Sequence, residues 1–512
     1  DYEFTINNAN TMAQNYTYLY PFNYGESEIG GDVIITEVGG YYDQLNYNGG
    51  SSKIKVAGDY TLTIKGVREH DKLYGIHNIE VEGDVSITLQ EADASFNSYG
   101  WTYMVKDSIC KKNVNITTKD NQFTSFEGVS NAEVTGNVTL RCSGDTASVS
   151  SGGSFYGLKM GKAEGSVTAE ITDCQYKYFY GLYTVSEIGG AVDMRINGGN
   201  YISKIEPCYE SNAKDNITLV VDGAVLGKDG NTINLTNPAA KDTYVVFDVK
   251  DTCTVNGNYY VENKPTVSPN KGGNMLAIGG DYYFTGFYPI TENVAAGSIY
   301  LSKGAIMKIP EGITISVEDS GMIYAQDGTQ FLIEGTLRGA VCQDNGYKVS
   351  SYYVNGGELD TPTDNISYLY YPITLDYLEE MGTVTAGGNV NGTSLCPELL
   401  FGRVGNPMSV TCKAKKGYES TSVEIKKLTG ESLSDITEDE TTAGKYSFTM
   451  PKEPVNINAA FAATQITLDK TELGLEAEFN VATTAESPLY DMANIEIIND
   501  AEEGTVSYEV DE

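Results

Sequence analysis

A short motif recurs at nearly constant spacing along the first half of the chain. A small polar residue, usually preceded by Gly, is followed by an apolar residue that opens a stretch of alternating apolar and polar positions. The apolar residues are Val33, Tyr60, Val85, Val114, Val138, Val167, Val192 and Ile217. Their spacing of roughly 24 to 29 residues lies in the range that marks stacked-repeat architectures. The sequence therefore predicts a solenoid.

The content of each repeat indicates what kind of solenoid to expect. Between about residues 31 and 235, each repeat contains a period-2 strand, an aromatic-Gly-apolar element such as Tyr156-Gly157-Leu158, and a short strand leading to the next Gly. Three short strands in a coil of roughly 26 residues fit a parallel β-helix, whose successive coils stack about 4.8 Å apart. No stretch shows a helical period over ten residues, so we expect an all-β chain.

The alternation also predicts which side chains face outward. If Leu182 points into the core, strict alternation places Tyr176, Tyr178 and Tyr180 in the core as well, and turns Phe179 outward. Phe155 occupies the matching place in the preceding repeat. Phe155, Phe179 and Tyr183 are therefore the candidate binding residues, because an exposed aromatic patch requires a functional explanation.

The β-helix is predicted over residues 1–360, with an N-terminal cap and an irregular insertion around residues 236–298. From residue 299 the coils resume with shorter turns, including the segment Ile309-Pro310-Glu311-Gly312. This pattern resembles the right-handed, pectate-lyase-like β-helices of many bacterial surface proteins. The resemblance is architectural and implies no catalytic motif.

A different module begins near Thr361-Pro362 and is predicted to span residues 365–461. Its ordered elements, Lys416-Gly417-Tyr418, Tyr446-Ser447-Phe448-Thr449-Met450-Pro451 and Ala459-Ala460-Phe461, resemble the Listeria–Bacteroides class of bacterial surface repeats. That resemblance implies a bacterial, extracellular protein in which the module acts as a stalk. Residues 462–512 resemble the start of an immunoglobulin-like domain. The expected fold is thus a right-handed parallel β-helix followed by small β-sandwich-like modules.

Charge and cysteine content limit the possible partners. The formal net charge is −36, which disfavours nucleic acids and anionic membrane surfaces. No apolar run is long enough for a transmembrane helix, and a monomer is expected. Of the eight cysteines, Cys396 and Cys412 leave a disulfide open, whereas the other six are expected to be buried thiols. No spacing suits zinc, so no metal or cofactor is predicted.

A search for catalytic groups finds no established motif. Asp93, Asp120, Asp145 and Asp173 fall near strand ends in successive repeats. A glycosidase needs two carboxylates at a suitable separation, but solvated turn acids are the favoured interpretation of these four. His77 and the nearby His70 are expected to be structural.

Three functions remain open at this point. The favoured hypothesis is a non-catalytic, adhesin-like surface protein whose β-helix binds a host glycoprotein, an immunoglobulin or a polysaccharide. The alternative is a polysaccharide-degrading lyase or glycosidase built on the β-helix. A structural wall or S-layer component is the third hypothesis.

Overall fold

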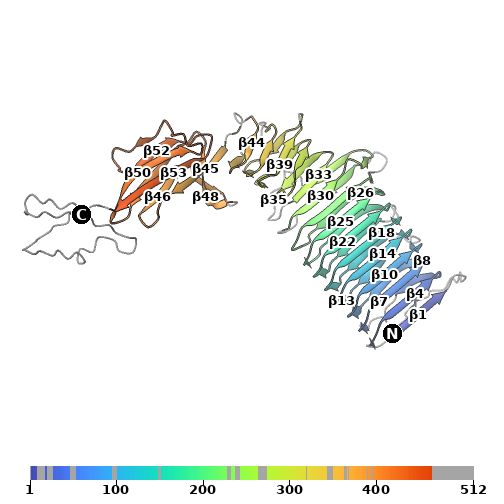
Figure 1. Ribbon diagram of the computed structural model, residues 1–512. Helices are drawn as coiled ribbons and strands as arrows, with labels where there is room; N and C mark the ends of the chain where they lie inside the picture. Colours follow the sequence, from blue (N-terminus) through green and yellow to red (C-terminus); the bar gives the residue numbers. More distant parts are fainter. Residues whose placement is uncertain are drawn as a thin grey trace, which may run out of the picture. The chain divides into compact units, whose positions relative to one another are not determined.

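The computed structural model shows a chain built from β-strands (Figure 1). It describes residues 2–7, 18–19, 27–46, 54–94, 101–147, 152–227, 232–236, 243–262, 274–318, 320–342, 350–362, 366, 368–388, 390–393 and 396–463. Within these ranges, all regular secondary structure is β-strand. The chain divides into two compact units, residues 1–367 and 368–512.

The first unit is a parallel β-solenoid, which confirms the predicted all-β solenoid class. The strand that opens each repeat joins a 14-stranded sheet, in which neighbouring coils pair in parallel as far as β33. These strands are β1 (Tyr2–Asn7), β4 (Val33–Val38), β7 (Tyr60–Lys65), β10 (Val85–Gln90), β14 (Val114–Lys119), β18 (Val138–Ser143), β22 (Val167–Thr172), β25 (Val192–Asn197), β27 (Ile217–Asp222), β30 (Val245–Val249) and β33 (Asn274–Ile278).

Two further sheets complete each coil. The second sheet is the one that carries the aromatic-Gly-apolar elements. Its longer strands are β5 (Tyr41–Asn46), β8 (Arg68–His77), β12 (Trp101–Lys106), β16 (Ser125–Ser130), β20 (Ser154–Lys159), β23 (Gln175–Tyr183), β26 (Asn200–Tyr209), β29 (Ile233–Thr236) and β32 (Tyr259–Glu262). The third sheet is formed by β3 (Ser27–Ile29), β6 (Ile54–Val56), β9 (Ile79–Val81), β13 (Ile109–Cys110), β17 (Glu133–Val134), β21 (Lys162–Ala163) and β24 (Glu187–Ile188).

The recurring Gly-Asp or Gly-Asn pair has a physical role at the corner before the first sheet. The backbone N–H of Asp84 donates to Asp59 Oδ1 at 2.8 Å, and that of Asn113 donates to Asp84 Oδ1 at 2.9 Å. The same bond links Asn137 to Asn113 at 3.0 Å. A Cβ on Gly83 would lie 2.3 Å from Asp59 Oδ1. A small polar residue that accepts this bond therefore recurs at the corner, and where a glycine precedes it, the missing Cβ leaves room for the acceptor of the neighbouring coil.

A second corner is buried and polar, contrary to the expectation for Asp145. The Asp145 side chain is fully buried, and it accepts hydrogen bonds from the Thr118 hydroxyl and from Asn121, whose backbone N and Nδ2 lie 3.0 and 2.8 Å from Oδ1. Burial raises the pKa of Asp145 to about 6. The prediction of a solvated turn acid was wrong here because the packing of neighbouring coils, rather than the turn itself, decides burial.

The other turn acids differ from Asp145. Asp120 and Asp173 are exposed and adopt left-handed backbone conformations, with φ of 54° and 52°. Asp is one of the few residues besides Gly that tolerates this region. Asp93 is half-buried in β11 (Asp93–Ala94). Asp120 and Asp173 therefore allow the backbone to turn, and Asp93 lies in a short strand.

The coils after β33 depart from the regular pattern. β33 pairs antiparallel with β34 (Asp281–Thr285), and parallel pairing then resumes through β37 (Ile299–Leu301) and β40 (Ile323–Ala325). The accompanying strands are β35 (Phe287–Pro289), β38 (Ile306–Ile309), β41 (Gln330–Ile333) and β43 (Ser351–Val354) in one sheet, and β36 (Val294–Ala296), β39 (Thr314–Val317), β42 (Thr336–Arg338) and β44 (Glu358–Asp360) in another.

The second unit contains two small sheets around a core that includes Val410, Phe448 and Ile457. One sheet contains β45 (Tyr368–Asp376), β47 (Val390–Thr393), β48 (Cys396–Arg403), β50 (Tyr418–Lys427) and β53 (Val455–Ala463). The other contains β46 (Gly382–Gly388), β49 (Pro407–Ala414), β51 (Thr437–Glu438) and β52 (Lys445–Thr449). Cys396 and Cys412 are not bonded to each other. The predicted immunoglobulin-like segment lies, beyond residue 463, outside the described residues.

The buried Asp145 makes stability depend on pH in a defined direction. Its folded-state pKa, about 6, exceeds the ordinary value of 3.8, so the folded state binds the proton more tightly. The free energy of unfolding should therefore fall as pH rises from about 4 to 6, by roughly 3 kcal/mol from this group. Asp145→Asn should match the parent at pH 4 and be the more stable protein at pH 8, as measured by thermal midpoints.

The control is Asp120→Asn, which neutralises an exposed carboxylate of an adjacent coil. Because this variant keeps Asp145, its stability should still fall as pH rises from 4 to 6. An Asp145→Asn difference that stays constant across this range would contradict a buried, proton-binding Asp145.

Candidate functional site

The second sheet carries three columns of side chains on the face opposite the core. Each column contains one residue per coil, as set by the parallel register of β8, β12, β16, β20, β23 and β26. The middle column is Tyr74, Tyr103, Glu127, Tyr156, Tyr180 and Glu206. The flanking columns are Lys72, Trp101, Ser125, Ser154, Tyr178 and Lys204 on one side, and His77, Lys106, Ser130, Lys159, Tyr183 and Tyr209 on the other.

The rings of these columns contact one another along the sheet. We call the set Tyr74, Trp101, Tyr103, Tyr156, Tyr180, Tyr183 and Tyr209 the aromatic platform. Ring centroids are 5.1 Å apart for Tyr74 and Tyr103, and 5.0 Å apart for Tyr156 and Tyr180. Trp101 lies 6.1 Å from Tyr103 and 6.4 Å from Tyr156, so it spans the coil where Glu127 interrupts the middle column.

The third column extends the platform sideways. Tyr183 stands nearly perpendicular to Tyr156 and Tyr180, with centroids 5.3 and 5.5 Å away, and stacks on Tyr209 at 4.7 Å. Edge-to-face and offset-stacked pairs are the favoured arrangements of aromatic rings. The platform is therefore an ordered surface of mutually supporting rings.

Lysine side chains lie over the platform rings. Lys106 Nζ is 4.0 Å from the Tyr103 centroid, and Lys159 Nζ is 4.4 Å from that of Tyr156 and 5.0 Å from that of Trp101. Such cation–π contacts contribute roughly 0.5–2 kcal/mol each. They hold ammonium groups at defined positions on the surface.

Two carboxylates are buried beneath the lysines. Lys159 Nζ donates to Glu127 Oε1 at 2.6 Å, and Glu127 is 1% exposed. Lys204 Nζ lies 2.7 Å from Glu206 Oε2, and Glu206 is 3% exposed. Each carboxylate thus has a positive partner, as buried charges require.

Tyr103, Tyr156 and Tyr180 remain protonated hydrogen-bonding groups at neutral pH. Burial raises the pKa of Tyr156 and of Tyr180 to about 12, and it also raises the pKa of Tyr103. Burial lowers the pKa of His77, whose Nε2 lies 3.1 Å from Asp107 Oδ2. The surface therefore combines phenol hydroxyls, ammonium groups and a mostly neutral imidazole with aromatic rings. The side chain of His70, also expected to be structural, lies outside the described part of the chain.

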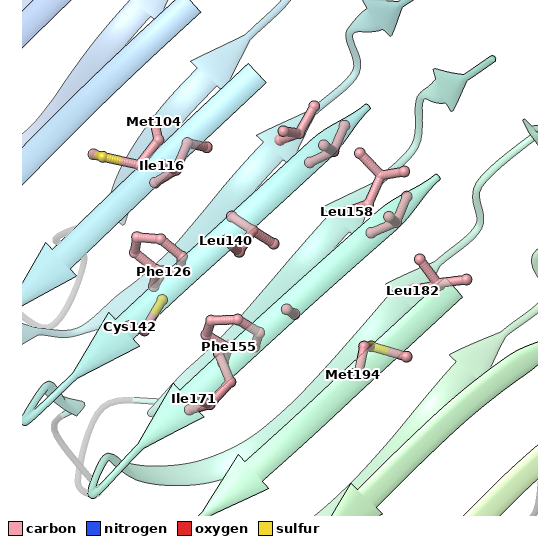
Figure 2. Packing of buried hydrophobic residues seen from close by; sticks show 14 of the residues in the cluster. Met104, Ile116, Phe126, Leu140, Cys142, Phe155, Leu158, Ile171, Leu182 and Met194 are labelled. Carbon is pink, nitrogen blue, oxygen red and sulfur yellow. The ribbon is translucent and has the colours of Figure 1, made fainter. Parts of the chain in front are cut away.

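The structure corrects the predicted binding residues. Phe155 and Phe179 are fully buried and stack on each other in the core, with centroids 4.9 Å apart. Figure 2 shows Phe155 inside the coils with Phe126, Leu140 and Leu158. Of the three predicted residues, only Tyr183 lies on the outer face.

The glycine of the aromatic-Gly-apolar element explains this error. In the register of β20 and β23, Tyr156 pairs with Tyr180 and Leu158 with Leu182, whereas Gly157 and Gly181 fall outside the pairs, so each strand contains one extra residue there. A Cβ on Gly157 would lie 2.6 Å from the Gly181 carbonyl oxygen. Strict alternation fails across this bend, and Tyr180 turns outward although Leu182 points inward. A second irregularity lies between Tyr176 and Tyr178.

The aromatic-Gly-apolar motif was the sequence signal that could have located the platform. A glycine repeated at one strand position indicates a bulge or a close backbone approach. If the alternation of faces is taken to break at the glycine, an inward Leu158 or Leu182 no longer requires an inward Tyr156 or Tyr180, and both tyrosines can face outward. The lysines and Trp101 carry no such signal, because their neighbours on the platform come from other coils.

The two buried carboxylates do not suit glycoside hydrolysis as a pair. Glu127 and Glu206 belong to the same column and are separated by three rungs, about 14 Å at the usual strand spacing. Glycosidase carboxylates lie roughly 5–9.5 Å apart. Among the described residues, no cluster of three or more His, Cys, Asp or Glu side chains could hold a metal ion. Nor does any helix in that part of the chain have the length and apolarity to span a membrane.

Comparisons with known proteins give little further guidance. No family model and no curated protein matches the chain. The tailspike protein of Escherichia coli bacteriophage HK620, in complex with a pentasaccharide, matches at 9% identity over 87% of this chain and 84% of that chain, with a TM-score of 0.21. A double mutant of the same tailspike matches at 8% identity over the same shares, with a TM-score of 0.19. At these TM-scores the likeness carries no argument.

The two faces of the second sheet predict opposite effects of substitution. Phe155→Ala should lower the free energy of unfolding by about 3–5 kcal/mol, since it removes a buried ring from the core. Tyr183→Ala should cost less than Phe155→Ala, because the Tyr183 ring is only partly buried and its removal opens no cavity in the core. Thermal or chemical unfolding monitored by circular dichroism measures both. A stable Phe155→Ala variant would contradict the inward orientation of the ring.

Proposed function

We propose that this is a non-catalytic bacterial surface protein whose β-solenoid binds a polysaccharide through the aromatic platform. The observation that carries the proposal is the continuity of the platform, whose rings touch from Tyr74 in β8 to Tyr209 in β26. The ring contacts extend over six coils, about 24 Å at the usual strand spacing. Tyr74 and the column residues of β16, namely Ser125, Glu127 and Ser130, are themselves buried, and Trp101 bridges the coil of β16.

The chemistry of the platform suits sugars. A sugar ring combines apolar C–H faces with a rim of hydroxyl groups. Tyrosine and tryptophan side chains provide an apolar body with a polar end, and the protonated Tyr156 and Tyr180 hydroxyls both donate and accept hydrogen bonds. Lys159, which pairs with the buried Glu127, adds an ammonium group to the same surface. These groups therefore match both the apolar C–H faces and the hydroxyl rim of a sugar ring.

The shape of the platform favours a polymer over a compact ligand. Its columns repeat one residue per coil along the solenoid axis, so similar groups recur at a spacing of about 4.8 Å. A polysaccharide is likewise a linear array of similar units. Binding by several adjacent subsites on a rigid surface limits the entropy lost on association. A folded protein partner, such as a host glycoprotein or an immunoglobulin, is an outcome of the test below.

The rest of the chain suits an extracellular setting. The resemblance of residues 365–461 to bacterial surface repeats supports a wall-attached or secreted protein in which the second unit is a spacer. The resemblance of residues 462–512 to an immunoglobulin-like domain points the same way. The acidic composition, with a net charge of −36, favours solubility.

A degradative activity is the competing outcome. The roughly 14 Å between the rungs of Glu127 and Glu206 counts against hydrolysis by this pair. An enzyme would release new reducing ends from a polysaccharide that it binds. Reducing-end assays on every bound polysaccharide therefore test the non-catalytic part of the proposal directly.

The platform predicts a specific loss of binding. The double variant Tyr156→Ala/Tyr180→Ala should weaken polysaccharide binding by the full-length chain at least about tenfold, because central aromatic anchors each contribute above 1 kcal/mol. Affinity electrophoresis against bacterial, plant and host polysaccharides identifies the ligand and measures the effect. Thermal midpoints confirm that the variant is folded.

A matched control is available on another sheet. Tyr300 and Tyr324 stack with centroids 4.7 Å apart and are only partly buried, so Tyr300→Ala/Tyr324→Ala removes a similar surface column. It should leave binding unchanged. Equal losses in both double variants, or no binding of any polysaccharide by the parent chain, would overturn the proposal.

A further inference from the structure

We propose that the polysaccharide bound by the platform is acidic, and that its acid groups bind at Lys106. This inference rests on the proposed function and specifies its ligand. The observation behind it is a local reversal of charge. The whole chain carries 70 acidic residues against 34 lysines and arginines, whereas the three platform columns hold four lysines and two glutamates. The charged members are Lys72, Lys106, Lys159, Lys204, Glu127 and Glu206.

Two of these lysines are already neutralised by the protein. Lys159 pairs with Glu127 at 2.6 Å, and Lys204 pairs with Glu206 at 2.7 Å. Both carboxylates are nearly inaccessible, so these pairs belong to the interior side of the platform. The uncompensated positive charge of the columns therefore resides on the remaining lysines.

Lys106 is the better placed of these. Its ammonium group lies 4.0 Å from the Tyr103 centroid and 5.5 Å from that of Tyr74. Within the described residues, no carboxylate lies at ion-pair distance from Lys106. The adjacent Asp107 is engaged elsewhere, because its carboxylate bonds His77 at 3.1 Å and Asn131 Nδ2 at 2.5 Å. Ring contacts thus fix the ammonium group without using up its hydrogen-bond donors.

The groups around Lys106 select an acceptor. A lysine ammonium offers three donors and no acceptor. The Tyr103 hydroxyl is held in its protonated form by burial, which raises its pKa, and so remains available as a donor. An acid group on a sugar, whether carboxylate or sulfate, supplies the acceptors and forms charge-assisted hydrogen bonds with the ammonium group. A neutral sugar hydroxyl supplies a weaker partner.

The net charge of the chain limits how acidic the ligand can be. A densely charged polyanion is repelled by the surrounding surface within about 8–10 Å at physiological ionic strength. A polysaccharide with acid groups separated by neutral sugars experiences less repulsion and still contributes one acid group at Lys106. The inferred ligand is therefore an acidic polysaccharide of moderate charge density.

The experiment compares matched polysaccharides on the full-length chain. Hyaluronan and its carboxyl-reduced form share one backbone and differ in charge, and chondroitin with and without sulfate distinguishes carboxylate from sulfate. The parent chain should bind at least one acidic form about tenfold or more tightly than its neutral partner. Lys106→Met, which keeps the apolar stem, should abolish that preference, whereas Lys106→Arg should retain it.

A control lysine and a folding readout complete the design. Lys55→Met removes a lysine of the third sheet that pairs with Glu82 at 3.3 Å, and it should leave the preference intact. Thermal midpoints establish that each variant is folded. Equal binding of acidic and neutral forms, or a preference that survives Lys106→Met, would overturn this inference while platform binding stands. Absence of binding to these and to all other polysaccharides would overturn the proposed function itself.

Discussion

Successive coils are linked at one corner by a side-chain-to-backbone hydrogen bond that recurs from Asp32 to Ser166. The side-chain oxygen of Asp59 accepts the backbone N–H of Asp84, and Asp84 does the same for Asn113. A hydrogen bond of this kind contributes about 0.5–1.5 kcal/mol. The bond is made only when consecutive coils are in one fixed register. The corner therefore stabilises the register in which these coils pair in the first sheet.

A fixed register converts sequence repeats into columns. Once Val138 lies between Val114 and Val167, every other position of the coil is also aligned with its equivalents. Inside, this alignment stacks the Phe126, Phe155 and Phe179 rings into the core. Outside, it stacks tyrosines and lysines into the platform. The same alignment of coils thus produces the core on the inner face of the second sheet and the candidate site on its outer face.

Much of the fold could be predicted from the sequence, because its signals are local and repeated. The strand that begins at Val138 alternates cleanly, and its spacing alone indicated parallel stacking. The faces of the second sheet could not be predicted by alternation. The bend at Gly181 is fixed by contacts with other coils, where a Cβ would lie 2.6 Å from the Pro207 carbonyl oxygen. Asp145 was misjudged for the same reason, since its burial comes from Thr118 and Asn121 of the preceding coil.

The glycine that misled the prediction also connects the fold to the proposed function. In Tyr156-Gly157-Leu158 the extra residue lets the tyrosine face outward and the leucine inward within three positions. Without the bend, alternation would place both on the same face, and the strand would supply either core or surface but not both. The close approach of Gly157 to the Gly181 carbonyl propagates the bend from coil to coil. A binding surface of stacked rings is therefore a direct consequence of how this solenoid closes its core.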